Sequence, residues 1–242
     1  MRHVRTARVR MRVLNKKTRG SLEKTDGDCV SKARTWPHWV WWISAGIILI
    51  ALNACIVLIS PQLGYESDNA TSPISLFVCF YVTAAAVHLL TLTRIRHTSA
   101  KGWLVAWVVA VGVILRVSVL FSEPILEDDF YRYLWDGGVL AHGFNPFTCV
   151  PEQAAQGGPE VPAQVHQLAI DSGVIIQRIN HASLATCYPP VAELLFAVAH
   201  LVGPWSLTVW RIVLLAFDAV TLALLCAILR QLGRSPLYAA VY

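Results

Sequence analysis

The hydrophobic positions fall into four long runs separated by polar segments. These runs are Trp39–Ile59, Ile74–Thr93, Trp103–Phe121 and Ser206–Leu229. Each is close to the about 20 residues that a helix needs to cross the hydrocarbon core of a bilayer. A helix satisfies its own backbone hydrogen bonds in lipid, so runs of this kind predict helices rather than open strands. We therefore expect an all-α fold, a polytopic bundle of transmembrane helices.

A fifth apolar run, Val191–Gly203, is shorter. Its 13 residues would span about 20 Å as a helix. Two interpretations stay open: the run crosses the membrane and places Arg230 and Arg234 outside, or it lies along the outer surface. We favour the surface interpretation, because Glu193 and His200 near the ends of the run suit an interfacial helix.

Composition supports the membrane class and excludes others. Of the 242 residues, 55% are hydrophobic and 14% are charged, against about 25% charged residues in soluble domains. The mean hydropathy is +0.52. The chain is therefore neither disordered nor an ordinary soluble enzyme. The net charge of +5 does not indicate nucleic-acid binding, because 11 of the 20 Lys and Arg residues lie in residues 1–38 without a recognisable nucleic-acid-binding module.

The distribution of charge predicts the orientation in the membrane. Residues 1–38 contain 11 Lys and Arg, residues 60–73 none, and residues 94–102 three, whereas residues 122–190 contain two against eight acidic residues. Lys and Arg favour the cytoplasmic side. We expect a multi-pass protein of the cell membrane with a cytoplasmic N-terminus and the 122–190 segment outside.

These expectations divide the chain into five parts. They are a basic cytoplasmic tail (1–38), three transmembrane helices (39–121), an outward-facing loop with short juxtamembrane helices (122–205), a fourth transmembrane helix (206–230) and residues 231–242. The last part is either a cytoplasmic tail or the start of a further span, because residues 236–242 turn apolar again. The basic tail is a topology signal and a candidate contact for anionic membrane lipids.

Acidic residues gather where the third span ends. Glu127, Asp128 and Asp129 are adjacent, and a helix read from Asp129 places Asp129, Arg132, Tyr133 and Asp136 on one face. We expect this face to meet water or substrate, with one carboxylate acting as a base. The alternatives are structural: Asp128 caps the helix, and Asp136 pairs with Arg132 or caps the two glycines that follow it.

Charged residues inside the spans are a second signal. Arg116 and Arg211 each lie five residues from the outer end of a span, about 7–8 Å deep. We expect the two arginines to meet at one depth and hold an anionic lipid-linked group such as a phosphate. The alternative is that they extend to the interface. Asp218 lies deeper and is expected to pair with another helix.

The loop returns through His181 and Tyr188. The histidines of the loop match no metal-ligand spacing, so we expect no metal and no cofactor. Cys149 and Cys187 are the only cysteines of the loop. Outside the cell either a disulfide between them or two free thiols is expected.

The motifs together resemble a known family. The segment EDDFYRYLWDGGVLAHGFNPF, then INHASLATCYPP, a short apolar helix and a span beginning near Arg211, is similar to the bacterial C-type (GT-C) membrane glycosyltransferases. The likeness is strongest to the mannosyltransferase-like branch that uses polyprenyl-phosphate sugars. It covers roughly residues 121–242, and family members continue with many further spans. The chain departs from the family at Gly138, where Arg is common after Trp-Asp-Gly.

The resemblance implies an activity and its residues. It implies transfer of a hexose, with mannose as the first candidate, from a polyprenyl-phosphate donor to a glycan or lipid acceptor in the cell envelope. Asp129 matches the catalytic base, with Asp128 as its close rival, and Arg211 with Arg116 would hold the phosphate. Further substrate contacts are expected from Arg132, Asp136, Tyr188 and His181.

The competing hypothesis is non-enzymatic. A transporter or membrane scaffold would use Arg116, Arg211 and Asp218 as an intramembrane charge relay. Transporters keep their functional charges near the middle of the membrane and commonly show repeated halves. Here the acidic residues gather in the loop and no repeat is visible, so the sequence favours the enzyme.

Overall fold

The computed structural model describes residues 38–64 and 72–242. These residues form helices and turns with no strand among them, which confirms the all-α prediction. Four helical segments of the described residues are long and apolar enough to cross a membrane: His38–Leu63, Ile74–His97, Gly102–Phe121 and Leu207–Gln231. Their α-helices are α2 (His38–Ile59), α3 (Ile74–Leu92), α4 (Gly102–Val117) and α10 (Leu207–Gln231). They coincide with the four predicted runs, so the chain has the features of a membrane-embedded helical protein. The predicted basic tail, residues 1–38, lies outside the described residues except for its last residue.

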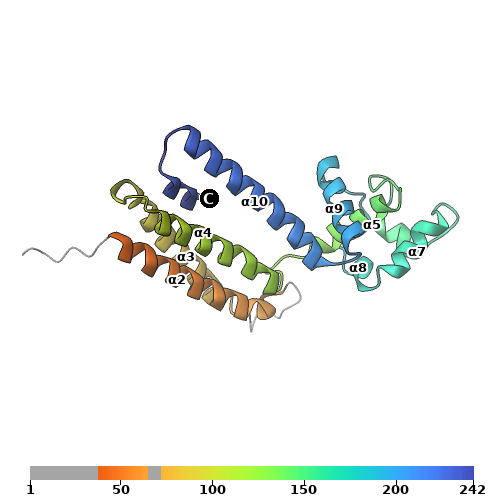
Figure 1. Cartoon of the computed structure of the whole chain (residues 1–242). Helices are drawn as coiled ribbons and strands as arrows, with labels where there is room; N and C mark the ends of the chain where they lie inside the picture. Colours follow the sequence, from red (N-terminus) through yellow and green to blue (C-terminus); the bar gives the residue numbers. More distant parts are fainter. Residues whose placement is uncertain (1–37, 65–71) are drawn as a thin grey trace, which may run out of the picture. The chain divides into compact units, whose positions relative to one another are not determined.

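Helix α2 lies alongside both α3 and α4 (Figure 1). Helix α4 approaches α2 closely at Gly46, where an added Cβ would lie 2.8 Å from Nε1 of Trp107. That indole donates a hydrogen bond of 3.1 Å to the carbonyl of Trp42. Small residues allow such approaches between membrane helices. Few other side chains of these helices are buried in the isolated chain, and some, such as Leu58, are exposed, which matches a surface that lipid covers.

One end of the helix bundle joins the segment between α4 and α10. Helices α2 and α4 continue there as the 3-10 turns η1 (Ser60–Leu63) and η3 (Ser118–Phe121). The amide of Glu123 donates to the hydroxyl of Ser60 at 2.9 Å, and the guanidinium of Arg211 donates to the carbonyl of Ser122 at 2.6 Å. The ends of α2 and α4 and the start of α10 therefore meet, and we call this the loop end of the bundle.

The opposite end of the bundle is closed by a small hydrophobic cluster. Trp42, Leu104, Ile95 of η2 (Ile95–His97) and Leu237 of η4 (Pro236–Val241) are all buried there. The six-residue 3-10 helix η4 packs against α4 and α10. Residues 236–241 thus form a short helix against the bundle, and both alternatives for residues 231–242, a cytoplasmic tail and the start of a further span, stay predictions.

Between α4 and α10, where every residue is described, the chain forms five shorter helices. They are α5 (Phe130–Ala141), α6 (Pro151–Gln156), α7 (Ala163–Asp171), α8 (Val174–Gln177) and α9 (Pro190–Val202). A hydrophobic core that includes Trp135, Val139 and Val165 joins them. Helix α9 begins at Pro190, one residue before the predicted run, because proline suits the first position of a helix.

Helix α9 packs along α5 and has two contrasting faces. Its inner face contacts α5 so closely at Gly137 that an added Cβ would lie 2.6 Å from the carbonyl carbon of Phe196. Its outer face leaves Val191, Leu194, Val198 and Leu201 exposed, as an interfacial helix requires. We expected Glu193 and His200 to lie at the membrane interface near the ends of this helix. Both are instead buried on its inner face, because α5 covers them.

Candidate functional site

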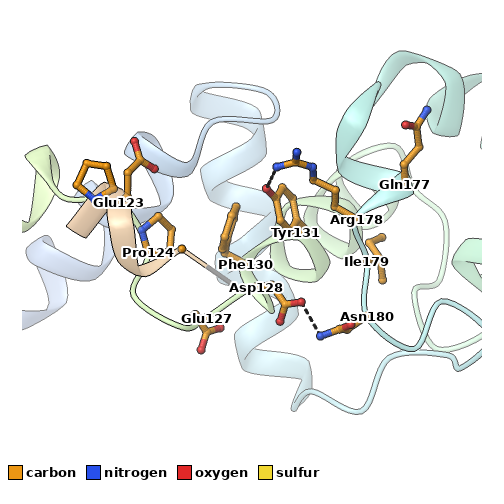
Figure 2. Close-up of a pocket in the computed structure, with 12 residues that line it drawn as sticks. Glu123, Pro124, Glu127, Asp128, Phe130, Tyr131, Gln177, Arg178, Ile179 and Asn180 are labelled. Carbon is orange, nitrogen blue, oxygen red and sulfur yellow. Dashed lines mark hydrogen bonds between the residues drawn. The ribbon is translucent and has the colours of Figure 1, made fainter. Parts of the chain in front are cut away.

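A cavity of the described residues lies at the loop end of the bundle. Its volume is about 620 Å³, and Figure 2 shows its polar wall. The lining residues come from η1 and the residue after it, from the segment before α5 and the first turn of α5, and from the end of α8 and the residues that follow it: Pro61, Gly64, Glu123, Pro124, Glu127, Asp128, Phe130, Tyr131, Gln177, Arg178, Ile179 and Asn180. We call this cavity the acidic pocket. It brings two of the predicted acidic residues, Glu127 and Asp128, together with Glu123 next to a bundle of apolar helices.

Asp128 is the carboxylate that the structure holds in the acidic pocket. It is half-buried, and its Oδ2 accepts a hydrogen bond of 2.5 Å from Nδ2 of Asn180 (Figure 2). The alternative that Asp128 caps α5 is wrong, because Asp129 occupies the N-cap position and its side chain does not cap either. Asp128 keeps the lone pairs of its second oxygen available to the cavity.

Asp129 takes a different environment. Its side chain is exposed, it is not among the residues that line the pocket, and its Oδ2 accepts a hydrogen bond of 3.3 Å from the Tyr188 hydroxyl. Burial raises the pKa of Tyr188, which keeps this hydroxyl a donor. The two adjacent candidates for the base are therefore separated by the turn that starts α5, and only Asp128 faces the cavity.

Glu127 adds a second carboxylate to the pocket. Burial, followed by the negative charge of Asp129, raises the pKa of Glu127. Its Oε1 accepts a hydrogen bond of 3.1 Å from the backbone amide of Asp129, which fixes the start of α5. A pair of neighbouring carboxylates with unequal environments is the arrangement from which general acid–base chemistry is built.

The opposite wall of the pocket is supplied by residues that sequence reasoning missed. Nη1 of Arg178 donates a hydrogen bond of 2.8 Å to the Tyr131 hydroxyl, and its guanidinium lies 5.8 Å from the ring centroid (Figure 2). The rings of Phe130 and Tyr131 lie 4.0 Å apart. An aromatic face beside amide and carboxylate groups suits the binding of a hydroxyl-rich ligand. The only sequence signal for this wall was the run of polar residues before His181. Such a run does not reveal which segment it contacts in the fold.

The prediction that Arg132 and Asp136 face water or substrate is wrong. Asp136 is 0% exposed and Arg132 is 8% exposed, because α9 covers this face of α5. Nε of Arg132 lies 2.9 Å from both carboxylate oxygens of Asp136, which confirms the alternative of an i, i+4 ion pair. Nη2 of Arg132 also donates to the carbonyl of Leu184 at 3.0 Å. Burial raises the pKa of Asp136, and the charge of Arg132 opposes that shift.

The remaining loop candidates are Tyr188 and His181, and only Tyr188 contacts a residue of the acidic cluster. Tyr188 contacts Asp129 and packs edge-on against Tyr133 at a centroid distance of 5.1 Å, so it belongs to the surroundings of the acidic cluster. His181 is exposed with a positive φ of 52° and is not among the lining residues of the acidic pocket. Within the described ranges, no group of three or more His, Cys, Asp and Glu residues is placed to hold a metal ion.

Arg116 and Arg211 line a second cavity, of about 370 Å³, between α4 and α10. The two arginines share this cavity, but they bind different partners. Arg211 donates to the carbonyls of Val119 and Ser122 at 3.3 and 2.6 Å, near the loop end. Arg116 instead pairs with Asp218, two helical turns further along α10, and with the main-chain oxygen of Tyr242 at 2.8 Å. The expected pairing of Asp218 with another helix is confirmed.

Cys149 and Cys187 are both free thiols, so the disulfide alternative is wrong. Cys187 is exposed, whereas burial raises the pKa of the half-buried Cys149. The thiolate is the reactive form, so an impermeant maleimide should modify Cys187 about 10-fold faster than Cys149. The measurement is a timed alkylation series at pH 7.5 read by peptide mass spectrometry. Equal rates at the two positions would contradict this placement.

Comparisons with known proteins do not extend these findings. No family model matches the chain, and no match is found among curated proteins or solved structures. The functional argument therefore depends on the site itself. The site consists of an open pocket with two adjacent carboxylates, an amide and an aromatic face, and of a second cavity that Arg116, Arg211 and Asp218 line between two apolar helices.

Proposed function

We propose that this chain is a membrane glycosyltransferase. It moves a hexose, with mannose as the first candidate, from a polyprenyl-phosphate donor to a hydroxyl of a glycan or lipid acceptor. The observation that carries the proposal is the acidic pocket, in which Asp128 and Glu127 face a cavity of about 620 Å³ at the end of the membrane helices. The resemblance of residues 121–242 to the GT-C glycosyltransferases supports the same reaction.

The chemistry assigns a role to each group. A sugar hydroxyl is a poor nucleophile until a base takes its proton, and Asp128 lines the pocket in which an acceptor would sit. The acceptor oxygen then bonds to the anomeric carbon of the donor sugar, and the bond from that carbon to the phosphate oxygen breaks. Polyprenyl phosphate leaves with the negative charge, which Arg211 at the neighbouring cavity would stabilise.

The proposed location follows from the distribution of charge. Lys and Arg dominate residues 1–38 and acidic residues dominate residues 122–190, which supports a cytoplasmic N-terminus and an acidic pocket outside the cell membrane. The exposed apolar face of α9 supports contact of the same segment with the outer lipid surface. The partners are thus a lipid-linked donor and an acceptor that reaches the membrane surface.

The test is direct transfer. Purified chain in lipid nanodiscs is incubated with radiolabelled polyprenyl-phosphate hexoses and a panel of glycan and lipid acceptors, and the product is counted. The proposal expects transfer from at least one donor, abolished in the double variant of Asp128→Asn and Asp129→Asn. Protein that remains helical by circular dichroism and transfers no sugar, or a double variant as active as the parent, would contradict the proposal.

Replacing Arg211 should weaken binding of the donor rather than the chemical step. Arg211→Ala removes charge-assisted hydrogen bonds, which contribute about 1.5–3 kcal/mol each, so the dissociation constant for polyprenyl phosphate should rise about 10- to 100-fold. Arg211→Lys keeps the charge and should recover part of the affinity. The measurement is microscale thermophoresis in nanodiscs. Unchanged affinity in Arg211→Ala would remove Arg211 from the proposed phosphate site.

One observation favours the second candidate, a non-enzymatic scaffold or transporter. Arg116 and Asp218 form an ion pair between α4 and α10, and Asp218 also accepts from the hydroxyl of Tyr242. Arg211 takes no part in this pair. The pair therefore suits a structural link between two membrane helices better than a relay of charge along them. The transfer assay with the double variant of Asp128→Asn and Asp129→Asn separates the two candidates.

A further inference from the structure

A cluster of buried polar side chains lies behind the acidic pocket, between α5, α9 and the segment that connects α8 to α9. We call residues 179–189 the return segment. The cluster consists of Arg132 and Asp136 of α5, Thr186 of the return segment and Glu193 of α9. Glu193 is 1% exposed, and Thr186 is 9% exposed. Burying this many polar groups is costly unless their hydrogen bonds are satisfied, so the cluster calls for an explanation.

The hydrogen bonds of the cluster converge on the return segment. Arg132 donates to the carbonyl of Leu184 at 3.0 Å, and the Thr186 hydroxyl donates to Oε1 of Glu193 at 2.8 Å. The amide of Tyr188 in turn donates to the Thr186 oxygen at 3.3 Å. The segment is thus held from α5 on one side and from α9 on the other.

The same segment supplies partners to both acidic residues at the start of α5. Asn180, near its beginning, donates to Asp128, and Tyr188, near its end, donates to Asp129. A shift of the return segment would therefore remove the hydrogen-bond partners of both carboxylates at once. None of the four buried residues of the cluster is among the residues that line the acidic pocket.

Glu193 is the one member of this cluster whose hydrogen bonding is incomplete. Its Oε2 is buried without a partner, although Oε1 accepts from Thr186. The groups that face it are Asp136 and Arg132 from α5 and Thr186 from the return segment; α10 packs on this side of α9 through the ring of Trp210 against Phe196. Burial, then the negative charge of Asp136, raises the pKa of Glu193 to about 7, against the opposing effects of Thr186 and Arg132.

We propose that Glu193 is a proton-dependent positioning residue, which in its neutral form seats the return segment against α5 and in its charged form releases it. In the neutral form the carboxyl lies beside Asp136 without adding a second negative charge to a buried site. In the charged form the site holds two carboxylates against the single guanidinium of Arg132, and one carboxylate oxygen has no donor. The link to catalysis rests on the proposed function; the movement of the segment does not.

The sign of the pH effect follows from the direction of the shift. A carboxyl with a raised pKa binds more protons when the segment is seated than when it is released. Seating is therefore most stable below pH 4.5, weakens as the pH rises, and reaches its weakest level above about pH 7. For one proton the ratio of released to seated segment rises by at most about 10-fold per pH unit.

Cys187 offers a direct reporter, because it is exposed and adjoins Thr186. A nitroxide on Cys187, with the other five cysteines replaced by serine, is measured by electron paramagnetic resonance in nanodiscs from pH 5 to pH 8.5. We expect the mobile fraction of the label to rise through this range. Glu193→Gln should remove most of the rise and leave the label immobile at pH 8.5. Glu160→Gln, which neutralises an exposed carboxylate of the same loop, should respond like the parent.

A second pair of variants protects the test against simple misfolding. Thr186→Val deletes the hydroxyl that joins the segment to Glu193 and should raise label mobility at every pH, whereas Thr186→Ser keeps the hydroxyl and should behave like the parent. A pH-independent label in the parent, or an equal response in Glu193→Gln, would overturn the proposal. None of these readouts requires sugar transfer, so a chain without transferase activity leaves the result interpretable.

Discussion

Sugar transfer should fall by about 10²- to 10⁴-fold when Asp128 is replaced by asparagine, the range typical of the loss of a general base. The carboxamide keeps the shape of the side chain and can still accept from Asn180, which donates to Asp128 at 2.5 Å. The substitution therefore removes only the basicity of the side chain at position 128. The measurement is the initial rate of hexose transfer at saturating donor, with donor affinity measured in parallel and expected to stay within about 2-fold, since the phosphate is assigned to another site.

Asp129→Asn is the matched control for this prediction. Asp129 is the neighbouring carboxylate, and the resemblance to GT-C enzymes assigns it the role of base, but the structure leaves it exposed and outside the pocket lining. We expect a loss of less than about 10-fold for Asp129→Asn, through its contact with Tyr188. The opposite ranking of the two variants would return the base to Asp129. Near-normal rates in both would end the catalytic interpretation of the acidic cluster.

Introducing a single methyl group at Gly137 should destabilise the packing of α5 on α9 more than other single-methyl changes in the loop region. An added Cβ would lie 2.6 Å from the carbonyl carbon of Phe196, and a backbone atom cannot move aside as the end of a side chain can. Overpacking of this kind costs about 1–3 kcal/mol. Gly137→Ala should therefore lower the thermal midpoint, followed by tryptophan fluorescence in detergent.

The control for this change is Gly102→Ala. Gly102 starts α4, and an added Cβ there meets nothing within 4 Å. Alanine is a better helix former than glycine by about 1 kcal/mol, so this variant should be neutral or slightly more stable. A midpoint for Gly137→Ala at or above that of Gly102→Ala would show that α5 and α9 are not in close contact. Gly138 is also closely packed, because an added Cβ there would lie 2.5 Å from the ring of Trp205.

The membrane helices could be predicted almost to the residue. The run Ile74–Thr93 became α3, Ile74–Leu92, and the run Ser206–Leu229 became α10, Leu207–Gln231. Transfer of about 20 apolar side chains into lipid depends on the local composition alone, so no partner has to be known. The start of α5 at Phe130 was also close to prediction, because the periodicity of apolar residues is a local signal.

The candidate site was only partly predictable. The sequence showed that acidic residues gather after the third span, and the structure places Asp128 and Glu127 of that group in one pocket. It did not show that Arg178 and Asn180, about fifty positions later, form the facing wall. Such pairs depend on how the return segment crosses α5, and a single sequence holds no periodic signal for a contact of that kind.

The sequence by itself determined which segments enter lipid, where the chain is acidic and where α5 and α9 begin. Only the tertiary structure decided which polar face is buried. Asp136 and Glu193 read as solvent-facing residues of amphipathic helices, yet both are enclosed because α5 and α9 pack face to face across Gly137. The physical reason is that helix periodicity defines faces but not their neighbours. The contact that turns a polar face inward depends on the shape and charge of a distant segment.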